Sequence, residues 1–516
     1  MPRILGFRLV AALMLTAPLA LNPTGALADA KNNVLTIGFS SEPFTLYPAM
    51  GVSGNDYPYL YSIYARILTF DPKSLQPRPG LAESWEFSPD KKVFRFKLRE
   101  NLTFQDGTTL DAAAVKASLM DFKENGRSQD LEVVQSINTP DARTVVINLD
   151  RPYSPMTAIL ADRAGMVISP TALKAAGKDF DRKPVGAGPF MVKSWTAGSN
   201  MELVPFTGYW DKSAIKLSGI TFKFIANATS LASAALAGQV DYAFGLDPKN
   251  LPALKANPRL RIAIEPSFSL NQIGIHLGYP PMENVLVRRA ISMSIDRKAL
   301  RDAILGKDLG DGPTALMVPP TLAFKSSPQF AESIKYDPIK AKQLLAEAGY
   351  PDGITLKICA SPGGVGTGTE ATDIEREQMK PAGISLNVTL MTSSACLQAY
   401  NLRREFQLWQ GGWSGRPHRF MTYSQYFGSQ GQYNKAKTKF PGVDEILDKI
   451  AATDDAEQQE VLFYELDKLW AEYMPVVPQF FRPNFAAYSV QVAGETPNAQ
   501  GKVDPTSIYF VANQKK

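Results

Sequence analysis

The stretch Val93-Phe-Arg-Phe-Lys-Leu-Arg99 alternates apolar and basic side chains along its length. Because successive side chains of a strand point to opposite faces, this pattern predicts a strand with one buried and one wet face. Asp106-Gly107 then predicts a turn, and Asp111 is placed to cap a helix that runs to Phe122. A hairpin is expected to follow, with strands at residues 131–137 and 144–149. The whole segment is therefore predicted to form one compact α+β unit.

The rest of the chain alternates between strand and helix patterns, which is typical of a mixed sheet with flanking helices. Strands are expected at residues 201–205, 220–225, 240–244, 273–277, 355–360 and 385–391. Helices are expected at residues 229–237, 285–295, 338–348, 370–380 and 444–473, the last with a break near Asp454. Because 516 residues exceed what one hydrophobic core usually serves, we expect an α/β protein with two lobes and a cleft between them.

The first 28 residues have the three parts of a secretory signal peptide. Arg3 and Arg8 give a basic start, residues 9–21 an apolar middle, and Ala26-Leu27-Ala28 a small-residue cleavage site, although Ala28-Asp29-Ala30 would also serve. No cysteine lies near the cleavage site, so a lipid anchor is not expected, and no later stretch reaches membrane-spanning length. The sequence therefore predicts a soluble, exported chain whose signal peptide is cleaved.

The composition argues against several function classes. Two of the 55 basic residues lie in the signal segment, so the rest of the chain balances 53 basic against 50 acidic side chains. Without blocks of Lys and Arg, that balance gives no support for nucleic-acid or membrane-surface binding. The two histidines, His276 and His418, form no metal-ligand pair, so no metal site and no cofactor are expected. No catalytic motif occurs, so the chain is not expected to be an enzyme.

Cys359 and Cys396 are the two cysteines of the chain. Because an oxidising compartment allows thiols to pair, we expect a disulfide between them. The alternative is a pair of buried free thiols that behave as small apolar residues.

The run from Trp409 to Phe420 is expected to hold the ligand-binding surface. A helix at 397–404 and a strand from Phe406 precede it, and Gly411-Gly412 is expected to end the regular structure there. Glycines let the backbone approach another molecule closely, while tryptophan offers a flat face and the polar residues offer hydrogen-bond donors. The alternative is an ordinary exposed turn. The candidate ligand-binding residues of this run are Trp413, Ser414, Gly415, Arg416 and His418.

Seven short motifs are spread in order along essentially the whole mature chain. They are Pro79-Gly-Leu-Ala-Glu-Ser-Trp85, Leu102-Thr-Phe-Gln-Asp-Gly-Thr108, Val185-Gly-Ala-Gly-Pro-Phe-Met-Val-Lys-Ser-Trp195, Gly208-Tyr-Trp210, Val285-Leu-Val-Arg-Arg-Ala-Ile-Ser-Met-Ser-Ile-Asp-Arg297, Gly442-Val-Asp-Glu-Ile-Leu447 and Pro475-Val-Val-Pro478. Together they resemble the motifs of the family 5 extracellular solute-binding proteins, the peptide, dipeptide and nickel binding components of ABC importers. Their agreement in order is a much stronger signal than any one of them.

The resemblance implies a two-lobed periplasmic binding protein fold with an extra inserted subdomain and a ligand cleft between the lobes. Residues 29–56, 188–267 and 482–516 would form a discontinuous first lobe, 57–187 the inserted subdomain and 268–481 the second lobe. Crossings near Phe268 and Phe481 would be the hinge about which the lobes close on a solute. The implied role is that of a periplasmic monomer that passes a small-molecule or peptide ligand to an inner-membrane ABC permease complex.

One position departs from the family pattern. Peptide-binding members commonly have an acidic residue three positions after the tryptophan of this loop, where the chain has Arg416. Because a guanidinium repels an amine and suits a carboxylate or phosphate, the expected ligand is a peptide-like or anionic organic solute. Trp413 would stack on it, and Glu42 or Phe44, just beyond the strand expected at 34–39, would contribute from the other lobe. The alternative is that Arg416 pairs with an internal carboxylate.

The identity of the ligand stays open at this point. Acidic or blocked peptides, glutathione-like compounds, opines and phosphorylated sugar conjugates all fit an anion site. A rival role within the family is a nickel or metal-chelate receptor that holds its chelate through arginine. From a different class, an extracytoplasmic hydrolase or chaperone is the remaining alternative, and saturable one-to-one stabilisation by a ligand would separate a receptor from a chaperone.

Overall fold

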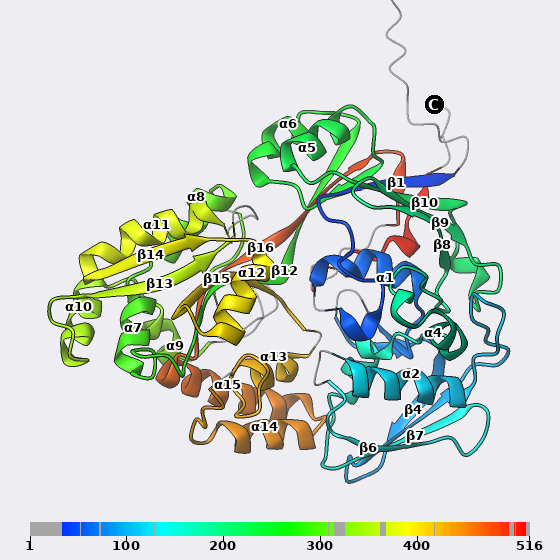
Figure 1. Ribbon diagram of the computed structural model, residues 1–516, viewed down its shortest axis with the longest axis horizontal. Coiled ribbons are helices and arrows are strands. Elements are labelled where there is room, and N and C mark those ends of the chain that lie inside the picture. The colour runs from blue at the N-terminus through cyan, green and yellow to red at the C-terminus, as the bar shows by residue number, and fades with distance from the viewer. Residues whose placement is uncertain are drawn as a thin grey trace, which may run out of the picture.

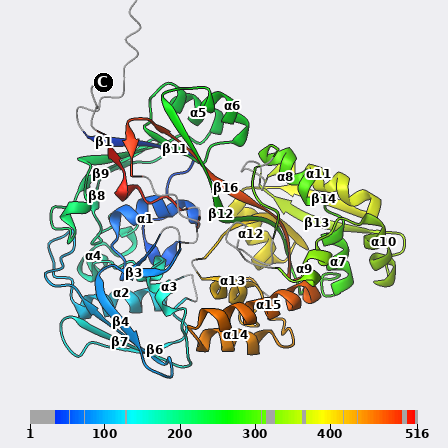
Figure 2. The ribbon, with the colours of Figure 1, turned by 180° about the vertical axis from the view of Figure 1, so that it is seen from behind.

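The computed structural model describes residues 33–51, 53–71, 74–126, 130–307, 309–313, 326–361, 368–416, 418–434, 436–494, 500 and 502–511. The signal peptide expected at residues 1–28 lies outside this part of the chain. The described residues form two lobes joined by a pair of long strands that run from one lobe into the other (Figures 1 and 2). No described helix is long and apolar enough to cross a membrane.

One ten-stranded sheet passes through both lobes in the order β14-β13-β15-β12-β16-β11-β1-β10-β9-β8. Its strands are β1 (Val34–Phe39), β8 (Phe190–Thr196), β9 (Asn200–Pro205), β10 (Gly219–Phe224), β11 (Tyr242–Phe244), β12 (Leu260–Ile275), β13 (Ile354–Ala360), β14 (Ile384–Leu390), β15 (Leu408–Ser414) and β16 (Val476–Ser489). We call the part around β1 and β8 to β11 the first lobe, and the part around β13 to β15 the second lobe. The two-lobed α/β architecture predicted from the sequence is confirmed.

The antiparallel pair β12 and β16 connects the lobes. Its register is interrupted between Glu265 and Ser269, opposite Arg482. At the interruption, the Ser267 hydroxyl donates to the Arg482 carbonyl at 2.7 Å and so replaces a hydrogen bond of the ladder. Beyond it, β12 also pairs with β15 of the second lobe. A break of this kind gives the pair a place at which to bend between the lobes.

A smaller four-stranded sheet lies beside the first lobe and is counted with it below. It is formed by β4 (Ala82–Phe87), β5 (Val93–Leu98), β7 (Thr144–Leu149) and β6 (Val134–Asn138), in that order. The cations of β5 are exposed and its Phe and Leu side chains are buried, as the alternation predicted. Helix α2 (Ala112–Asn125) packs beside this sheet (Figure 1), and Asp111 caps it by accepting a hydrogen bond from the Ala114 amide at 2.9 Å.

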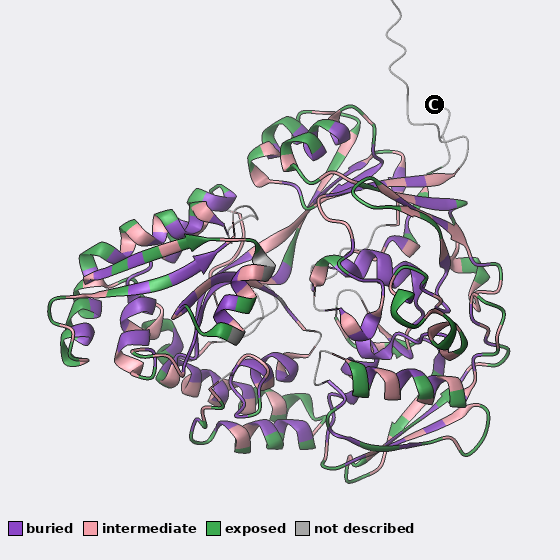
Figure 3. Cartoon of the chain, viewed as in Figure 1, coloured by how far each residue is buried: buried purple, intermediate pink, exposed green. Residues whose placement is uncertain are grey.

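The helices of the second lobe lie around its sheet, and the last three of them form a group below it, next to the small sheet of the first lobe (Figure 1). They include α7 (Val285–Met293), α8 (Arg297–Leu305), α10 (Pro338–Glu347), α11 (Thr369–Met379), α13 (Arg419–Tyr426), α14 (Val443–Ala452) and α15 (Ala456–Tyr473). The break predicted near Asp454 is present, because α14 ends at Ala452 and Asp455 caps α15. Their apolar faces point inward, so buried residues fill the interior of each lobe while exposed ones follow the outer helix faces (Figure 3).

Candidate functional site

A cavity of about 700 Å³ lies where β12 and β16 cross between the lobes. Both lobes line it. Phe39, Ser40 and Asn55 come from the first lobe, while Ile304 and Glu370 come from the second. A volume of this size falls in the range of small-molecule sites, and a wall shared by two lobes is the arrangement that lobe closure would enclose.

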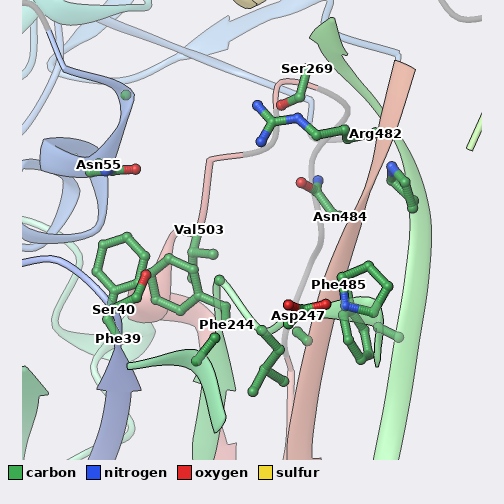
Figure 4. A pocket seen from close by; sticks show the side chains of 18 of the residues that line it. Phe39, Ser40, Asn55, Phe244, Asp247, Ser269, Arg482, Asn484, Phe485 and Val503 are labelled. Carbon is green, nitrogen blue, oxygen red and sulfur yellow. The ribbon is translucent and has the colours of Figure 1, made fainter. Parts of the chain in front are cut away.

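The polar end of the cavity is formed at the strand crossing. Ser269 of β12 and Arg482 of β16 are directly paired across the two strands, and both side chains point into the cavity (Figure 4). Asn484 lies next to them on β16 (Figure 4). Burial lowers the pKa of Arg482 to about 10, which leaves the guanidinium charged at neutral pH. The cavity therefore carries a fixed positive charge beside neutral hydrogen-bonding groups.

An aromatic wall stands apart from this polar end (Figure 4). The rings of Phe39 and Phe244 are stacked, with centroids 3.8 Å apart and planes 19° from parallel. Both side chains line the cavity, as do Phe485 and Val503. Because β1 and β11 are parallel neighbours with Phe39 opposite Phe244, the sheet itself holds the two rings together. The wall offers a flat apolar surface to part of a ligand.

The other charged residues that line the cavity are engaged with neighbouring groups. Glu370 forms an ion pair at 3.0 Å with Lys249, which lies in the other lobe. Asp504 lies 3.4 Å from Arg66. Asp247 accepts a hydrogen bond from the backbone amide of Lys249 at 2.9 Å. Each of these carboxylates has a structural partner, which reduces its attraction for a ligand cation.

Arg416, the residue expected to attract an anionic ligand, lies against a carboxylate of the first lobe. Its Nη1 atom is 3.8 Å from Oδ2 of Asp162, whose oxygens also contact Lys502 Nζ at 3.1 Å. Burial opposes the charge on Arg416, but Asp130, Tyr57 and Asp162 nearby raise its pKa. Lys502 lines the cavity, so this cluster borders the ligand space and ties the loop of the second lobe to the first.

Trp413 packs inside the second lobe. Only 7% of its surface is exposed, and its ring meets the rings of Tyr426 and Tyr433 edge-on, at 5.0 and 5.2 Å. Next to it, a side chain on Gly415 would come within 2.1 Å of Phe268 Cβ, so glycine is required where the loop passes β12. The side chain of Ser414 lies outside the described part of the chain.

The glycines of this run do not end the regular structure, contrary to the expectation from the sequence. β15 continues through both of them, with Gly411 opposite Gln272 and Gly412 opposite Asn271 of β12. A Cβ on Gly411 would lie 2.1 Å from Cζ2 of Trp409, because the indole ring folds over the strand there. This glycine therefore makes room for a side chain within a paired strand, and a chain break is not needed to explain it.

Three other candidate residues lie away from the cavity wall. His418 Nδ1 accepts a hydrogen bond from the Phe420 amide at 3.2 Å and so caps α13, while burial and Arg419 lower its pKa to about 4. Glu42 accepts from the Gly198 amide at 3.1 Å. Phe44 is 60% exposed. Like Trp413 and Arg416, they are not among the described residues that line the cavity, and their ligand-binding roles stay predictions.

The two cysteines are joined. Cys359 of β13 and Cys396 form a disulfide, with a Cα–Cα distance of 5.7 Å. Cys396 belongs to α12 (Ser393–Gln398), so the bridge ties this helix to the sheet of the second lobe. Among the described residues, no group of three or more His, Cys, Asp or Glu side chains is placed to hold a metal ion.

The lobes also touch on the side of the cleft away from the crossing strands. The amide and hydroxyl of Ser154 donate to the carbonyls of Ala451 and Thr453, each at 2.7 Å. Lys91 forms an ion pair with Asp454 at 2.5 Å. With contacts at both edges of the cleft, the structure shows the lobes in a closed arrangement.

Sequence reasoning did not single out Arg482. It stands in Phe480-Phe-Arg-Pro-Asn-Phe485, one cation inside an apolar run at the expected lobe crossing. A charged side chain inside an apolar run is the signal that would have marked it, since charged residues are mostly exposed unless they are paired or functional.

Comparisons with known proteins agree on a family. Residues 76–435 match the model of the bacterial extracellular solute-binding proteins, family 5. The glutathione-binding protein GsiB of Salmonella paratyphi A is 30% identical over 94% of this chain and 95% of its own length. The agropinic acid complex of AgaA from A. tumefacien R10 has a TM-score of 0.83 at 23% identity, covering 93% of this chain and 99% of that one. NikZ of Campylobacter jejuni with Ni(L-His) has a TM-score of 0.79 at 19% identity, with coverage of 93% and 99%.

Proposed function

Because this chain belongs to the bacterial extracellular solute-binding proteins of family 5, we propose that it captures a peptide-like or anionic organic solute between its lobes. It then delivers the solute to the inner-membrane permease of an ABC importer. The observation that carries the proposal is the cavity of about 700 Å³ at the lobe crossing, lined by residues of both lobes. Opening at the crossing would expose this space, and closing would enclose a solute.

Native mass spectrometry of the protein purified from its own periplasm tests this function. A closed two-lobed receptor is expected to retain solute at one molecule per chain, and the mass should disappear on denaturation. A melting scan before and after stripping supplies a second readout, since a ligand at a hundred times its dissociation constant adds about 2.7 kcal/mol to stability. Absence of both retained solute and ligand-dependent stabilisation would contradict the receptor function.

Reduced glutathione is the first solute to test. The similar protein GsiB is a glutathione-binding protein, and the match covers nearly the full length of both chains. Glutathione also has carboxylates that suit a guanidinium in the cavity. A nickel chelate is the second candidate within the family. It would have to be held through arginine, because the described residues offer no cluster of metal ligands.

The remaining expectations are part of the same proposal. Removal of residues 1–28 on export gives a mature chain that begins at Asp29 in the periplasm, which N-terminal sequencing of the purified protein checks. The discontinuous first lobe, with its boundaries near Phe268 and Phe481, moves as one body against the second. The protein acts as a monomer, and light scattering at micromolar concentration checks that state.

A further inference from the structure

We propose that the two lobes carry a latch on the side of the cleft away from the crossing strands, and that this latch holds them closed before a solute is bound. In the first lobe it consists of Lys91, Tyr153 and Ser154, which contact α13 and the C-terminal end of α14 in the second lobe. The inference goes beyond solute capture, because it concerns the ligand-free protein.

Ser154 binds the end of α14 with both its backbone and its side chain. Its amide donates to the Ala451 carbonyl and its hydroxyl to the Thr453 carbonyl, each at 2.7 Å, and the hydroxyl also lies 3.4 Å from the Ile450 carbonyl. The last carbonyls of a helix have no partner within the helix, so water or a capping group must satisfy them. Ser154 therefore caps α14 from the other lobe, and it can do so only while the lobes are closed.

Lys91 adds a charge to the same contact. Its ammonium pairs at 2.5 Å with Asp454, which lies two residues beyond the end of α14 at Ala452. A cation at this place also suits the negative end of the helix dipole. The Lys91 carbonyl accepts a hydrogen bond from the Tyr153 amide at 3.2 Å. The first lobe thus holds Lys91 and Ser154 beside each other, ready to contact the second lobe together.

An apolar contact completes the latch. The rings of Tyr153 and Phe420 meet edge-on, with centroids 5.4 Å apart and planes at 84°. Phe420 belongs to α13, so this contact also joins the two lobes. Both side chains are buried. Because separation of the lobes would expose both rings to water, closure at this place is favoured by burial of apolar surface.

The place of the latch suits control of opening. α14 lies beside the four-stranded sheet, whereas β12 and β16 cross on the other side of the cleft (Figures 1 and 2). In a rotation about the crossing, groups far from the axis move most, so the latch contacts must break when opening starts. None of the described residues that line the cavity belongs to the latch. The latch therefore acts without contacting the solute.

Hydrogen exchange at Ser154 tests the latch on the full-length mature protein. Bound solute is removed by unfolding in guanidinium and refolding, and native mass spectrometry verifies its removal. Pro152 and Pro155 have no amide hydrogen, so a peptide of residues 151–156 contains few amides and the signal of Ser154 can be resolved. The wild-type Ser154 amide should exchange at least about 10-fold more slowly than in a free peptide. The Tyr153 amide, which bonds within the first lobe, is the internal reference.

Two variants weaken the latch. Ser154→Ala removes the hydroxyl and should speed exchange of the amide at position 154 by about 3- to 10-fold, after correction for the intrinsic rate of alanine. Asp454→Asn removes the charge opposite Lys91 and should speed it by about twofold. The radius of gyration from small-angle scattering should rise in both variants, and a melting scan verifies that each folds. Ser233→Ala is the matched control, because the Ser233 hydroxyl donates to the Thr229 carbonyl within α5 (Ala228–Leu236) at 2.9 Å.

The other results contradict the proposal. Exchange of the wild-type Ser154 amide at the free-peptide rate would show that the latch does not form without a solute. Faster exchange with an unchanged radius of gyration would show that the contact frays while the lobes stay together. Unchanged exchange in both variants, or an equal increase in Ser233→Ala, would also overturn it.

Two features keep the test decisive. The Asp454 side chain is 64% exposed, so Asp454→Asn carries the test if Ser154→Ala does not fold. The exchange and scattering measurements use no solute. The latch can therefore fail while the receptor function stands, and the receptor function can fail while the latch stands.

Discussion

The Nη1 atom of Arg416 lies 3.8 Å from Oδ2 of Asp162, although the two residues belong to different lobes. Lys502, also on the first lobe, lies 3.1 Å from the same carboxylate. Burial raises the pKa of Asp162, but Lys502 and Arg416 more than offset this, so the pKa is lowered and the carboxylate stays charged. The ion pair thus holds the loop around Arg416 against the first lobe in the closed arrangement.

Replacing Arg416 with Gln is expected to open the ligand-free protein. Loss of the partly buried interlobe pair should cost about 1 kcal/mol of closed-state stability, since Asp162 keeps Lys502 as a partner. The radius of gyration by small-angle scattering should rise, and solute affinity should fall about fivefold. Lys193→Gln is the control, because Lys193 pairs with Glu202 within the first lobe. If the radius of gyration is unchanged and the variant loses affinity for anionic solutes alone, Arg416 instead contacts the ligand directly.

A second interlobe pair closes over the cavity itself. Lys249 and Glu370 lie 3.0 Å apart, and both side chains are more than half exposed, so salt screens their attraction. Lys249→Glu should weaken solute binding by up to about fivefold at low salt and by less at 0.5 M salt. The charge-swapped double variant Lys249→Glu/Glu370→Lys should recover the loss. If the swap fails to recover affinity, Glu370 acts on the ligand and not on Lys249.

Local sequence patterns predicted the helices and strands in which apolar residues recur with a single helix or strand period. β5, β13, β14 and α10 begin and end within two residues of their expected positions, because each has an uninterrupted strand or helix period, and α2 continues three residues beyond its expected end at Phe122. β16 was not predicted, since Pro478 and Pro483 interrupt its apolar run. The structure places both prolines beside shifts in the β12 and β16 register, where no regular ladder hydrogen bond is required.

The site was predicted less completely than the fold. The motif around Trp413 identified a segment at the lobe interface, but its arginine faces Asp162, which is far away in the sequence. The cavity wall combines Phe39, Phe244 and Arg482 from three distant strands, and nothing local marks them as neighbours. Contacts between residues of different lobes depend on the tertiary structure. They leave no periodic pattern in the sequence from which they could be predicted.

Removing the disulfide should destabilise the second lobe. Cys359 and Cys396 are both buried and close a loop with a sequence separation of 37 residues. Opening a loop of that length costs about 2–4 kcal/mol of unfolding free energy. The Cys359→Ser/Cys396→Ser variant should therefore unfold at lower urea concentration, followed by tryptophan fluorescence. The wild-type protein with a reductant should behave like the variant, and identical midpoints with and without reductant would argue that the bridge does not form in solution.

A buried carboxyl in the second lobe should make stability depend on pH. Glu375 of α11 is fully buried, its Oε1 accepts a hydrogen bond from Gln479 Nε2, and Arg297 lies near enough to interact with its charge. Burial raises the pKa of Glu375 from 4.5 to about 8, because the charged form loses its hydration. Below pH 8 the folded protein therefore holds a proton that the unfolded chain releases above about pH 4.5.

Because the folded protein holds this proton and the unfolded chain does not, the free energy of unfolding should fall as the pH rises. Below pH 4.5 the Glu375 carboxyl is protonated in both the folded and the unfolded protein. The stability that this proton provides is lost as the pH rises from 4.5 to about 8. Unfolding free energy should fall there by up to about 1.4 kcal/mol per pH unit, measured by urea titrations between pH 5 and 8. Glu375→Gln should flatten that slope, whereas Glu377→Gln on the exposed face of the same helix should not. Equal slopes in the wild type and Glu375→Gln would show that Glu375 is ionised in the folded protein.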